Sequence, residues 1–302
     1  MSIWVCGEVL IDLIPGADGV RVAHVGGGPA NTAKALARLG HDVQFIDGIS
    51  TDDYGVKARA ELLVDEVKLD LALTSDKPTC LAIVTLAADR KASYEFKIDG
   101  TATFDFGLNW LPDPSVHKPS VLHIGTLVTI VEPGASVLYD WALQVAEFAP
   151  IVFDPNIRPS VMGDRDRYQA AVEKWAAISS VIKVSDDDLT WLFPGQPFEE
   201  IAKRWVSDGA ALVVVTRGVN GSIGYTEGGV EEAHGVKIDL ADTVGAGDTV
   251  GAIIVEAMIQ DGILSLQGAG LKKILIRAAK AAAITCSRAG AQPPYKHELT
   301  KI

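Results

Sequence analysis

The sequence predicts an α/β protein with a central, mostly parallel sheet and helices on both faces of that sheet. Short β-branched runs alternate with helix-like stretches along most of the chain, as expected of βαβ units. The run Leu212–Val215 is continuously apolar, which is typical of a strand buried on both faces. The predicted strands are 3–13, 43–49, 120–127, 150–156, 181–185 and 211–218, and the predicted helices are Pro29–Leu39, Val137–Glu147, Tyr168–Ile178 and Phe198–Val206.

Two parts of the chain depart from this alternation. Beyond Val244 the pattern is helical, with long helices expected at Gly245–Gln260 and Leu271–Ser287. In the first third, strand-like runs follow one another with no helix between them. We expect these runs to form a small antiparallel lid, made by about 14–25 and 67–103, on a single domain spanning 1–302. The expected lid strands are Arg21–Val25, Val67–Leu73, Cys80–Ala87 and Ala92–Ile98.

Composition narrows the class of protein. Of the 302 residues, 48% are apolar and 22% are charged, as in ordinary globular proteins. The net charge of −12 argues against nucleic acid or an anionic membrane as a partner, because both attract basic surfaces. No apolar run reaches the roughly 18 residues of a transmembrane helix. The three cysteines, Cys6, Cys80 and Cys286, are too scattered for a disulfide framework or a zinc site, so we expect a cytoplasmic location.

The tetrapeptide Gly-Ala-Gly-Asp at 245–248 is the first candidate for chemistry. A glycine-rich turn that enters a helix leaves backbone N–H groups unpaired at the positive end of the helix dipole, which is a site for an anion. Asp248 would repel that anion, but it suits a general base that takes a proton from a hydroxyl while the amides hold a phosphoryl group. The alternative interpretation is that Asp248 only caps the helix.

A second glycine-rich stretch, "VGGGPANTAKALARLG", precedes a predicted helix. Its three glycines, Gly26, Gly27 and Gly28, allow a ligand to approach the backbone closely, and Asn31 offers both a donor and an acceptor to a hydroxylated ligand. A tight turn that only starts a helix is the alternative. The spacing is not that of a dinucleotide fingerprint, and no glycine in the chain precedes a lysine as a P-loop requires.

Together, "GGGPANTAKALARLG" and "DTVGAGDTVGA" resemble the two signatures of the ribokinase (PfkB) family of carbohydrate kinases, in the same order and over essentially the whole chain. The resemblance implies a ribokinase-like fold and a kinase that uses ATP and Mg²⁺. It assigns Asp248 as the catalytic base, with Gly245, Ala246 and Gly247 as the anion hole.

The resemblance also implies a sugar site. It places Asp12 of "GEVLIDL" on the sugar hydroxyls, together with Gly26, Gly27, Gly28 and Asn31. The stretch "FDPNIRPS" is similar to the D-x-N-x-R pattern of fructokinases and 2-keto-3-deoxygluconate kinases, in which Arg158 would meet the sugar or the γ-phosphate. A solubilising acid at a strand end and a plain surface arginine are the alternatives for Asp12 and Arg158.

Nucleotide and ion sites follow from the same resemblance. "KVSDDDL" aligns with a Lys-x-Asn-x-x-Glu pattern in which Ser185 replaces Asn, and Asp188, as a residue of the magnesium shell, replaces Glu. Lys183 would face the nucleotide phosphates, or alternatively be a solvated lysine at a strand end. The remaining implied residues are Thr216 and Gly218 in the nucleotide-binding turn, Gly221 in the hairpin that follows, and Asp242 with the Val244 carbonyl, near Ser287–Ala291, for a monovalent cation such as K⁺.

Within the family, "GEVLIDL" and "DPNIRP" favour a fructokinase, and so does the lack of an acid after "LHIG", where Thr126 and Leu127 stand. The same features fit 2-keto-3-deoxygluconate kinase, for which Arg158 or one of the lid residues Arg90, Lys91 and Lys97 would supply a cation. Another sugar or nucleoside kinase, or a sensor of sugar or nucleotide without catalysis, remains as an alternative. Pairing of two lids would make a homodimer.

Overall fold

The computed structural model describes residues 2–16, 18–86 and 92–300. Its main sheet has eight strands in the order β14-β13-β12-β11-β10-β9-β1-β4. Neighbouring strands from β12 to β4 are parallel, while β13 and β14 add an antiparallel edge. The strands are β1 (Ile3–Cys6), β4 (Val43–Ile46), β9 (Val121–Gly125), β10 (Ile151–Asp154), β11 (Val181–Ser185), β12 (Leu212–Thr216), β13 (Ser222–Thr226) and β14 (Gly229–Ala233).

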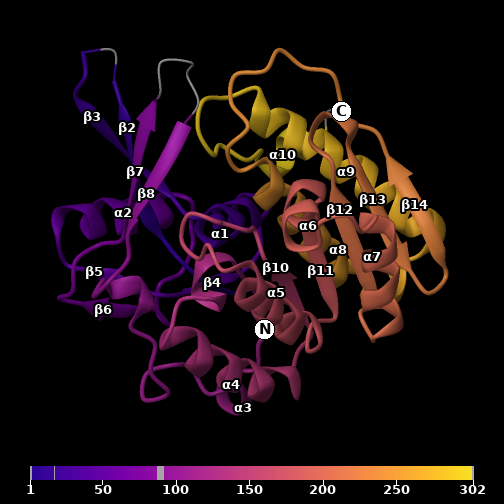
Figure 1. Ribbon diagram of the computed structural model, residues 1–302, viewed down its shortest axis with the longest axis horizontal. Coiled ribbons are helices and arrows are strands. Elements are labelled where there is room, and N and C mark those ends of the chain that lie inside the picture. Colours follow the sequence, from indigo (N-terminus) through magenta and orange to yellow (C-terminus); the bar gives the residue numbers. More distant parts are fainter. Residues whose placement is uncertain (1, 17, 87–91, 301–302) are drawn as a thin grey trace.

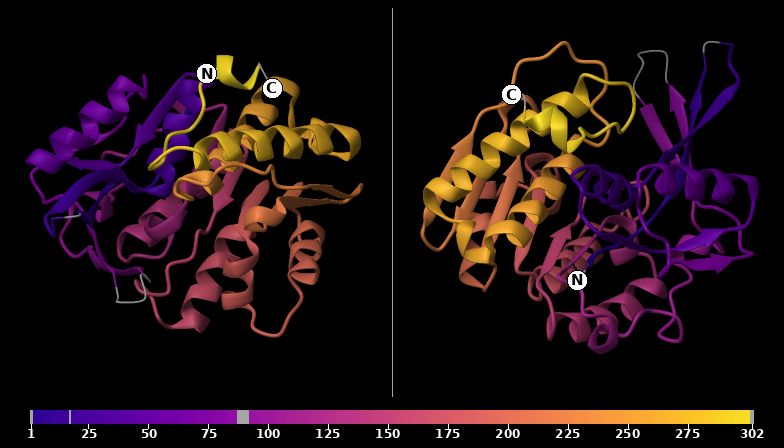
Figure 2. Two further views of the ribbon diagram at one scale, coloured as in Figure 1. Left: turned by 90° about the horizontal axis from the view of Figure 1, so that it is seen from above. Right: turned by 180° about the vertical axis from the view of Figure 1, so that it is seen from behind.

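Helices cover both faces of this sheet, as the alternating pattern predicts (Figures 1 and 2). On one face, the tryptophans of α4, α5 and α7 pack into one apolar core. On the other, α1, α8 and α9 contribute Leu36, Ile254 and Leu275 to a second core. The helices are α1 (Gly28–Arg38), α2 (Asp53–Val64), α3 (Pro114–His117), α4 (Gly134–Ala146), α5 (Arg165–Ala176), α6 (Asp186–Leu192), α7 (Phe198–Ser207), α8 (Ala246–Asp261), α9 (Gly268–Cys286) and α10 (Lys296–Leu299).

Two predicted strands are each divided between two sheets. The run 3–13 gives β1 and then β2 (Leu10–Pro15), and the run 43–49 gives β4 and then β5 (Gly48–Ser50). Both breaks meet at the buried carboxylate of Asp47, which accepts hydrogen bonds from the amides of Val9 and Gly48 at 2.8 Å each. The side chain thus replaces a strand partner at each break.

A four-stranded lid rises from this body in the order β3-β2-β7-β8 (Figure 1). Its hairpins β2–β3 and β7–β8 are antiparallel, as expected, and a parallel pairing of β2 with β7 joins them. The expected lid strand 67–73 is wrong: Lys68 bridges Gln44, and the strand that follows, β6, pairs with β5. The strands added here are β3 (Arg21–Gly26), β6 (Leu73–Ser75), β7 (Leu81–Leu86) and β8 (Ala92–Lys97).

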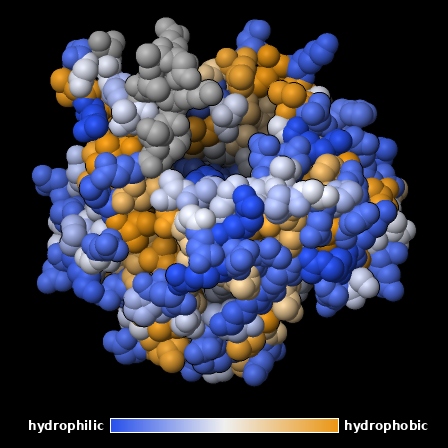
Figure 3. Space-filling model, in the orientation of Figure 1, coloured by the Kyte–Doolittle hydropathy of each residue, from blue (hydrophilic) through white to orange (hydrophobic). Residues whose placement is uncertain are grey.

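The strand order reverses between β1 and β9, because the chain continues from β1 to one edge of the sheet and from β9 toward the other. In open α/β sheets, ligands bind beyond the carboxyl ends of the strands at such a switch point. Figure 3 shows the surface hollowed between the lid and the α/β body. Among the described residues, no helix has the length and apolar character needed to cross a membrane.

Candidate active site

The amino end of α8 is built as the sequence predicts. Gly245 precedes the helix with φ 79°, a left-handed conformation that glycine adopts without steric cost. In the described part of the chain, the amides of Gly247 and Asp248 have no backbone acceptor. These amides lie at the positive end of a helix of 16 residues, so this turn can hold an anion.

Asp248 does not cap this helix. Its carboxylate makes no cap hydrogen bond and instead accepts one from Asn31 Nδ2 on α1 at 2.9 Å. The side chain is buried, and burial raises its pKa to about 6; Asp154 also raises the pKa, while Lys183, Asn31 and Arg158 lower it. The two glycine-rich motifs therefore meet at this carboxylate, which can accept a proton near neutral pH.

Three side chains converge on Gly28. A Cβ atom placed on Gly28 would lie 3.0 Å from Asn156 Nδ2, 3.1 Å from Thr126 Cγ2 and 3.2 Å from Asp248 Oδ1. Thr126 and Asn156 follow neighbouring strands and have positive φ angles of 63° and 38°. Such backbone strain in residues other than glycine is concentrated at functional sites, and it is unusual for a β-branched threonine. Sequence reasoning did not find these two residues as site residues, although their place after β9 and β10 was an available signal.

Asp12 lies on the lid and not on the main sheet, because β2 leaves the body after Val9. It pairs with His24 across the β2–β3 hairpin, and a Cβ atom on Gly26 would collide with its carboxylate. Burial raises the pKa of Asp12 to about 6, against the lowering effect of His24 and Arg158. Gly26 and Gly27 are likewise enclosed, since a Cβ atom on Gly27 would strike the carbonyl oxygen of Glu8.

Arg158 is half-buried and lies among acidic side chains. Its Nη1 donates to the carbonyl oxygen of Ile157 at 2.9 Å, and its backbone amide donates to Tyr168 Oη at 3.0 Å. Its positive charge lowers the pKa of Asp12 and of Asp248. The Arg158 charge therefore acts on the two acids that the sequence assigns to the sugar and to catalysis.

Glu8 is a buried acid that sequence reasoning did not assign, although it belongs to the quoted "GEVLIDL". Its Oε1 accepts a hydrogen bond from Thr126 Oγ1, and its Oε2 is buried without a partner among the described residues. Burial raises the pKa of Glu8 to about 7, against the hydrogen bond of Thr126 and the charge of Arg158. Glu8 therefore contacts Thr126, the residue with the positive φ angle, through this hydrogen bond.

The residues of the "KVSDDDL" stretch, from Lys183 to Leu189, make structural contacts. The Lys183 ammonium is buried and pairs with Asp154 at 2.7 Å, so the interpretation as a solvated lysine is wrong. Ser185 and Asp188 form a capping box at the start of α6, and Asp188 Oδ1 also accepts from the amide of Ile157 at 3.1 Å. These bonds fasten the Arg158 loop to α6.

Asp188 can still serve a magnesium shell. Asp188 Oδ1 accepts a hydrogen bond from the amide of Ile157, and Oδ2 accepts one from the amide of Ser185. Each carboxylate oxygen can accept from a second partner as well. In the described ranges, no group of three acidic, histidine or cysteine side chains is placed to hold a metal ion.

The predicted nucleotide residues lie at the next strand end. Thr216 ends β12, and its Oγ1 donates to the carbonyl oxygen of Val184 at 3.4 Å. Gly218 and Gly221 have positive φ angles of 51° and 86°, and a Cβ atom on Gly221 would strike the Ala233 carbonyl oxygen. Gly221 therefore permits the turn into β13, as its predicted hairpin role requires.

The residues expected at a monovalent cation form one loop junction. Asp242 Oδ1 accepts from the amides of Thr243 and Val244, and its Oδ2 accepts from the amide of Gly290 at 2.9 Å. The amide of Asp242 also donates to the Cys286 carbonyl oxygen. Asp242 thus joins the chain before α8 to the chain after α9, which places the expected oxygens of 287–291 beside it.

Residues 2–298 match the family model described as pfkB family carbohydrate kinase. The chain belongs to this family. PfkB relatives include a fructokinase of Rhizobium leguminosarum bv. trifolii, which is 33% identical over 86% of this chain and 80% of its own length. Fructokinase-2 of Solanum habrochaites is 29% identical over 95% of this chain and 90% of its own.

Solved PfkB-like structures agree with this assignment. A fructokinase of Vibrio cholerae O395, with fructose, ADP and calcium ion bound, superimposes with a TM-score of 0.88. It is 27% identical and covers 100% of this chain and 98% of its own. An aminoimidazole riboside kinase of Salmonella enterica has a TM-score of 0.84 at 21% identity, with coverage of 100% and 99%, and shows the shared fold.

Proposed function

We propose that this PfkB kinase is a fructokinase that transfers the γ-phosphoryl group of ATP to a hydroxymethyl group of fructose. The observation that carries the proposal is the meeting of Asp248, Asn31 and Gly28 at the unpaired amides of α8. The fructokinase relatives and the structure of one of them with fructose and ADP support fructose as the acceptor.

In the proposed reaction, Asp248 takes the proton of the attacking hydroxyl, and that oxygen then attacks the γ-phosphorus in line with the leaving ADP. Asn31 orients the Asp248 carboxylate through its hydrogen bond. The amides of Gly247 and Asp248, which have no backbone acceptor in the described part of the chain, stabilise the negative charge that spreads over the phosphoryl oxygens. Within the predicted anion hole of Gly245, Ala246 and Gly247, the Ala246 amide donates to the Thr243 carbonyl oxygen at 3.3 Å. Asp12 on the lid accepts hydrogen bonds from sugar hydroxyls, and closure of the lid excludes water.

The nucleotide would lie beside Thr216, Gly218 and Gly221, at the carboxyl end of β12. Mg²⁺ would be held by Asp188 together with the phosphates, where it neutralises their charge. A monovalent cation would sit by Asp242 and the Val244 carbonyl. Lys183 and Ser185, on β11, would lie at the same end of the sheet as the nucleotide phosphates. Lys183 is held there by its ion pair with Asp154.

A 2-keto-3-deoxygluconate kinase is the second candidate, and the observation that favours it is the position of Arg158. A guanidinium whose charge acts on both Asp12 and Asp248 could pair with the carboxylate of an acid sugar. Among the other expected cations, Arg90 and Lys91 lie outside the described residues, and Lys97 is exposed and pairs with Glu95. Other sugar or nucleoside kinases, and a sensor, remain as alternatives.

The test is ADP release with ATP, Mg²⁺ and K⁺ against fructose, 2-keto-3-deoxygluconate, ribose and adenosine. We expect the highest kcat/KM with fructose. A preference for the acid sugar would replace fructose as the substrate. ATP binding without turnover on any acceptor would favour the sensor.

A homodimer and a cytoplasmic location stay proposals. The cross-strand pair Ile14 and Val22 on the lid is exposed by 37% and 48%, which supports pairing of two lids. Sedimentation that shows only monomer would exclude the dimer. The three cysteines are free thiols, which is compatible with a reducing compartment.

A further inference from the structure

The side chain of Lys183 runs beneath the first two turns of α8. A Cβ atom on Gly247 would lie 2.9 Å from Lys183 Nζ, and one on Gly251 would lie 4.0 Å from Lys183 Cδ. These two glycines are one helical turn apart and face the sheet. Their lack of side chains lets the lysine stem pass under the helix, with its ammonium at the turn that precedes Asp248.

A buried ammonium at this end of a helix needs compensation, because the helix dipole is positive there. Asp154 on β10 supplies it: Asp154 Oδ2 lies 2.7 Å from Lys183 Nζ, and both side chains are buried. Burial lowers the pKa of Lys183, but Asp154, Asp248 and Asp188 outweigh it and raise the pKa. The lysine therefore remains a cation.

His123 on β9 completes this buried cluster without adding charge. Its Nε2 lies 3.6 Å from a Cβ atom placed on Gly251, and neither ring nitrogen has a partner among the described residues. Burial, with a smaller effect of Lys183, lowers its pKa to about 4 against the raising effect of Asp154. His123 is thus neutral at pH 7, and the charges closest beneath Asp248 are those of Lys183 and Asp154.

We propose that Lys183, fixed by Asp154, is a positioning residue that keeps Asp248 ionised and adds positive charge beneath the phosphate-binding turn. This inference rests on the proposed function for its catalytic meaning, but its electrostatic content belongs to the chain alone. It differs from a role as a nucleotide ligand, because the ammonium is already buried and paired with Asp154.

The pair predicts two opposite effects on one carboxyl group. Lys183 stabilises the charged form of Asp248, and Asp154 destabilises it. Arg158, from the loop after β10, also lowers the pKa of Asp248, and it is common to all variants. Loss of the lysine charge must therefore raise the pKa of Asp248, and loss of the Asp154 charge must lower it.

The experiment is a ¹³C NMR titration of the Asp248 carboxyl carbon in protein labelled at aspartate, with the signal assigned by its loss in Asp248→Asn. We expect Lys183→Met to raise the pKa of Asp248 by about one or more and Asp154→Asn to lower it. The matched control is Lys34→Met, which removes another buried lysine, paired with Glu61 of α2 at 2.5 Å. We expect the control to leave the Asp248 titration unchanged.

Unchanged titrations, or shifts of the same sign in both variants, would overturn the proposal. So would weaker ATP binding by Lys183→Met with an unaltered Asp248 titration, since that is the behaviour of a nucleotide ligand. If Lys183→Met does not fold, Asp154→Asn, which keeps the side-chain size, decides by the sign of its shift. Failure of the proposed function would appear separately, as wild-type protein that titrates as expected but phosphorylates no sugar.

Discussion

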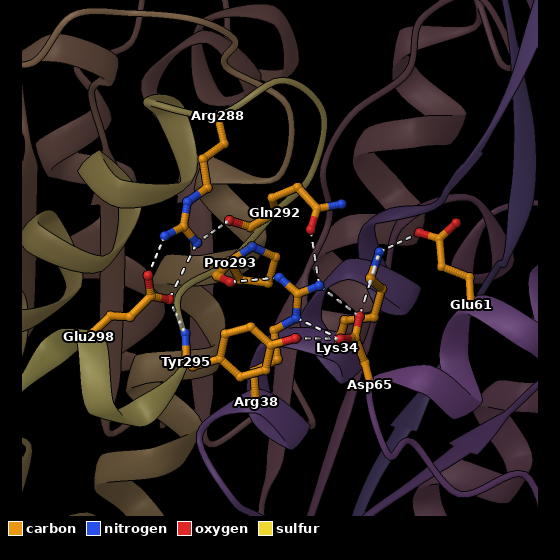
Figure 4. A network of polar contacts seen from close by, with 9 residues as sticks. All are labelled: Lys34, Arg38, Glu61, Asp65, Arg288, Gln292, Pro293, Tyr295 and Glu298. Atoms are coloured by element: carbon orange, nitrogen blue, oxygen red, sulfur yellow. Dashed lines mark hydrogen bonds and ion pairs between the residues drawn. The ribbon is translucent and has the colours of Figure 1, made fainter.

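Two buried charge clusters in this kinase are built on different plans. One lies under α8 and is made by His123, Asp154, Lys183 and Asp248; because we propose Asp248 as the base, we call it the catalytic cluster. The other joins α1 to the C-terminal end of α2 and to the segment after α9, and we call it the C-terminal clasp (Figure 4). The clasp consists of Lys34, Arg38, Glu61, Asp65, Arg288, Gln292, Pro293, Tyr295 and Glu298.

In the clasp, Arg38 is the residue whose side chain has the most hydrogen-bond partners. Arg38 donates to both carboxylate oxygens of Asp65, at 2.7 and 3.0 Å, and to the Pro293 carbonyl oxygen at 2.8 Å. Its guanidinium also lies 4.8 Å from the centre of the Tyr295 ring. Among the described residues, no buried side-chain N or O atom of the clasp lacks a partner.

In the catalytic cluster, some buried hydrogen-bonding atoms have no partner within the described part of the chain. Asp154 Oδ1 and both nitrogens of His123 are buried without partners among the described residues. Unsatisfied buried polar groups cost free energy, and they persist at sites where a ligand or a reaction uses them. The difference is that the clasp satisfies its buried polar atoms, as a structural cluster does, whereas the catalytic cluster leaves some unpaired among the described residues, as expected of our proposed reactive carboxylate.

The largest expected effect concerns the catalytic cluster. We expect Asp248→Asn to lower kcat by roughly 10²–10⁴, because it removes the base. The protein should keep its thermal stability, since burial of the Asp248 carboxylate is unfavourable at neutral pH, as its raised pKa shows. Steady-state kinetics and thermal unfolding of the same preparation measure both effects. Near wild-type turnover would exclude Asp248 as the base.

The clasp should give the reverse pattern. We expect Arg38→Met to lower the free energy of unfolding by about 3–5 kcal/mol, because the buried Asp65 carboxylate loses the guanidinium at 2.7 Å and keeps only the Lys34 ammonium, at 3.9 Å. Denaturant unfolding measures this loss. Well below the melting temperature, kcat should stay within about a factor of three of wild type. A large loss of kcat in folded Arg38→Met would erase the distinction between the clusters.

The pH dependence of activity tests the charge state directly. Because burial raises the pKa of Asp248 to about 6 and only the ionised carboxylate is a base, kcat/KM should rise with pH up to about 6 and level off above it. Below that value it should fall about tenfold per pH unit, and more steeply if protonation of Asp12, whose pKa is also raised to about 6, weakens sugar binding. Arg38→Met should show the same acid limb. An acid limb near pH 4 would contradict the assignment.

The smallest effect is expected at the rim of the clasp. Arg288 pairs with Glu298, and these side chains are exposed by 32% and 27%. Partly solvated ion pairs contribute little, so Arg288→Ala should lower the free energy of unfolding by less than about 1 kcal/mol. Comparison with Arg38→Met in the same denaturant series shows whether burial sets the difference. Equal losses would mean that it does not.

The sequence by itself determined the fold class and the two glycine-rich motifs that contain Asn31 and Asp248. β-branched runs and helical periods depend on local spacing, so the six predicted strands of the main sheet are present and the predicted helices lie within a few residues of their expected bounds. A ligand that approaches the backbone closely requires glycines at fixed positions. Asp248 and Asn31 can therefore be found in the sequence by their places beside these glycines. Helix α2 was missed, because only Gly55, Ala58 and Leu62 of its residues are buried and it has no strong apolar stripe.

Only the tertiary structure decided which residues meet. The division of the run 3–13 depends on Asp47, 38 positions from the Val9 amide it accepts. The strained Thr126 and the pair of Lys183 with Asp154 likewise depend on strand order and register. Local sequence does not encode these distances, because side chains from β9, β10 and β11 become neighbours only when the parallel sheet brings their carboxyl ends to one edge.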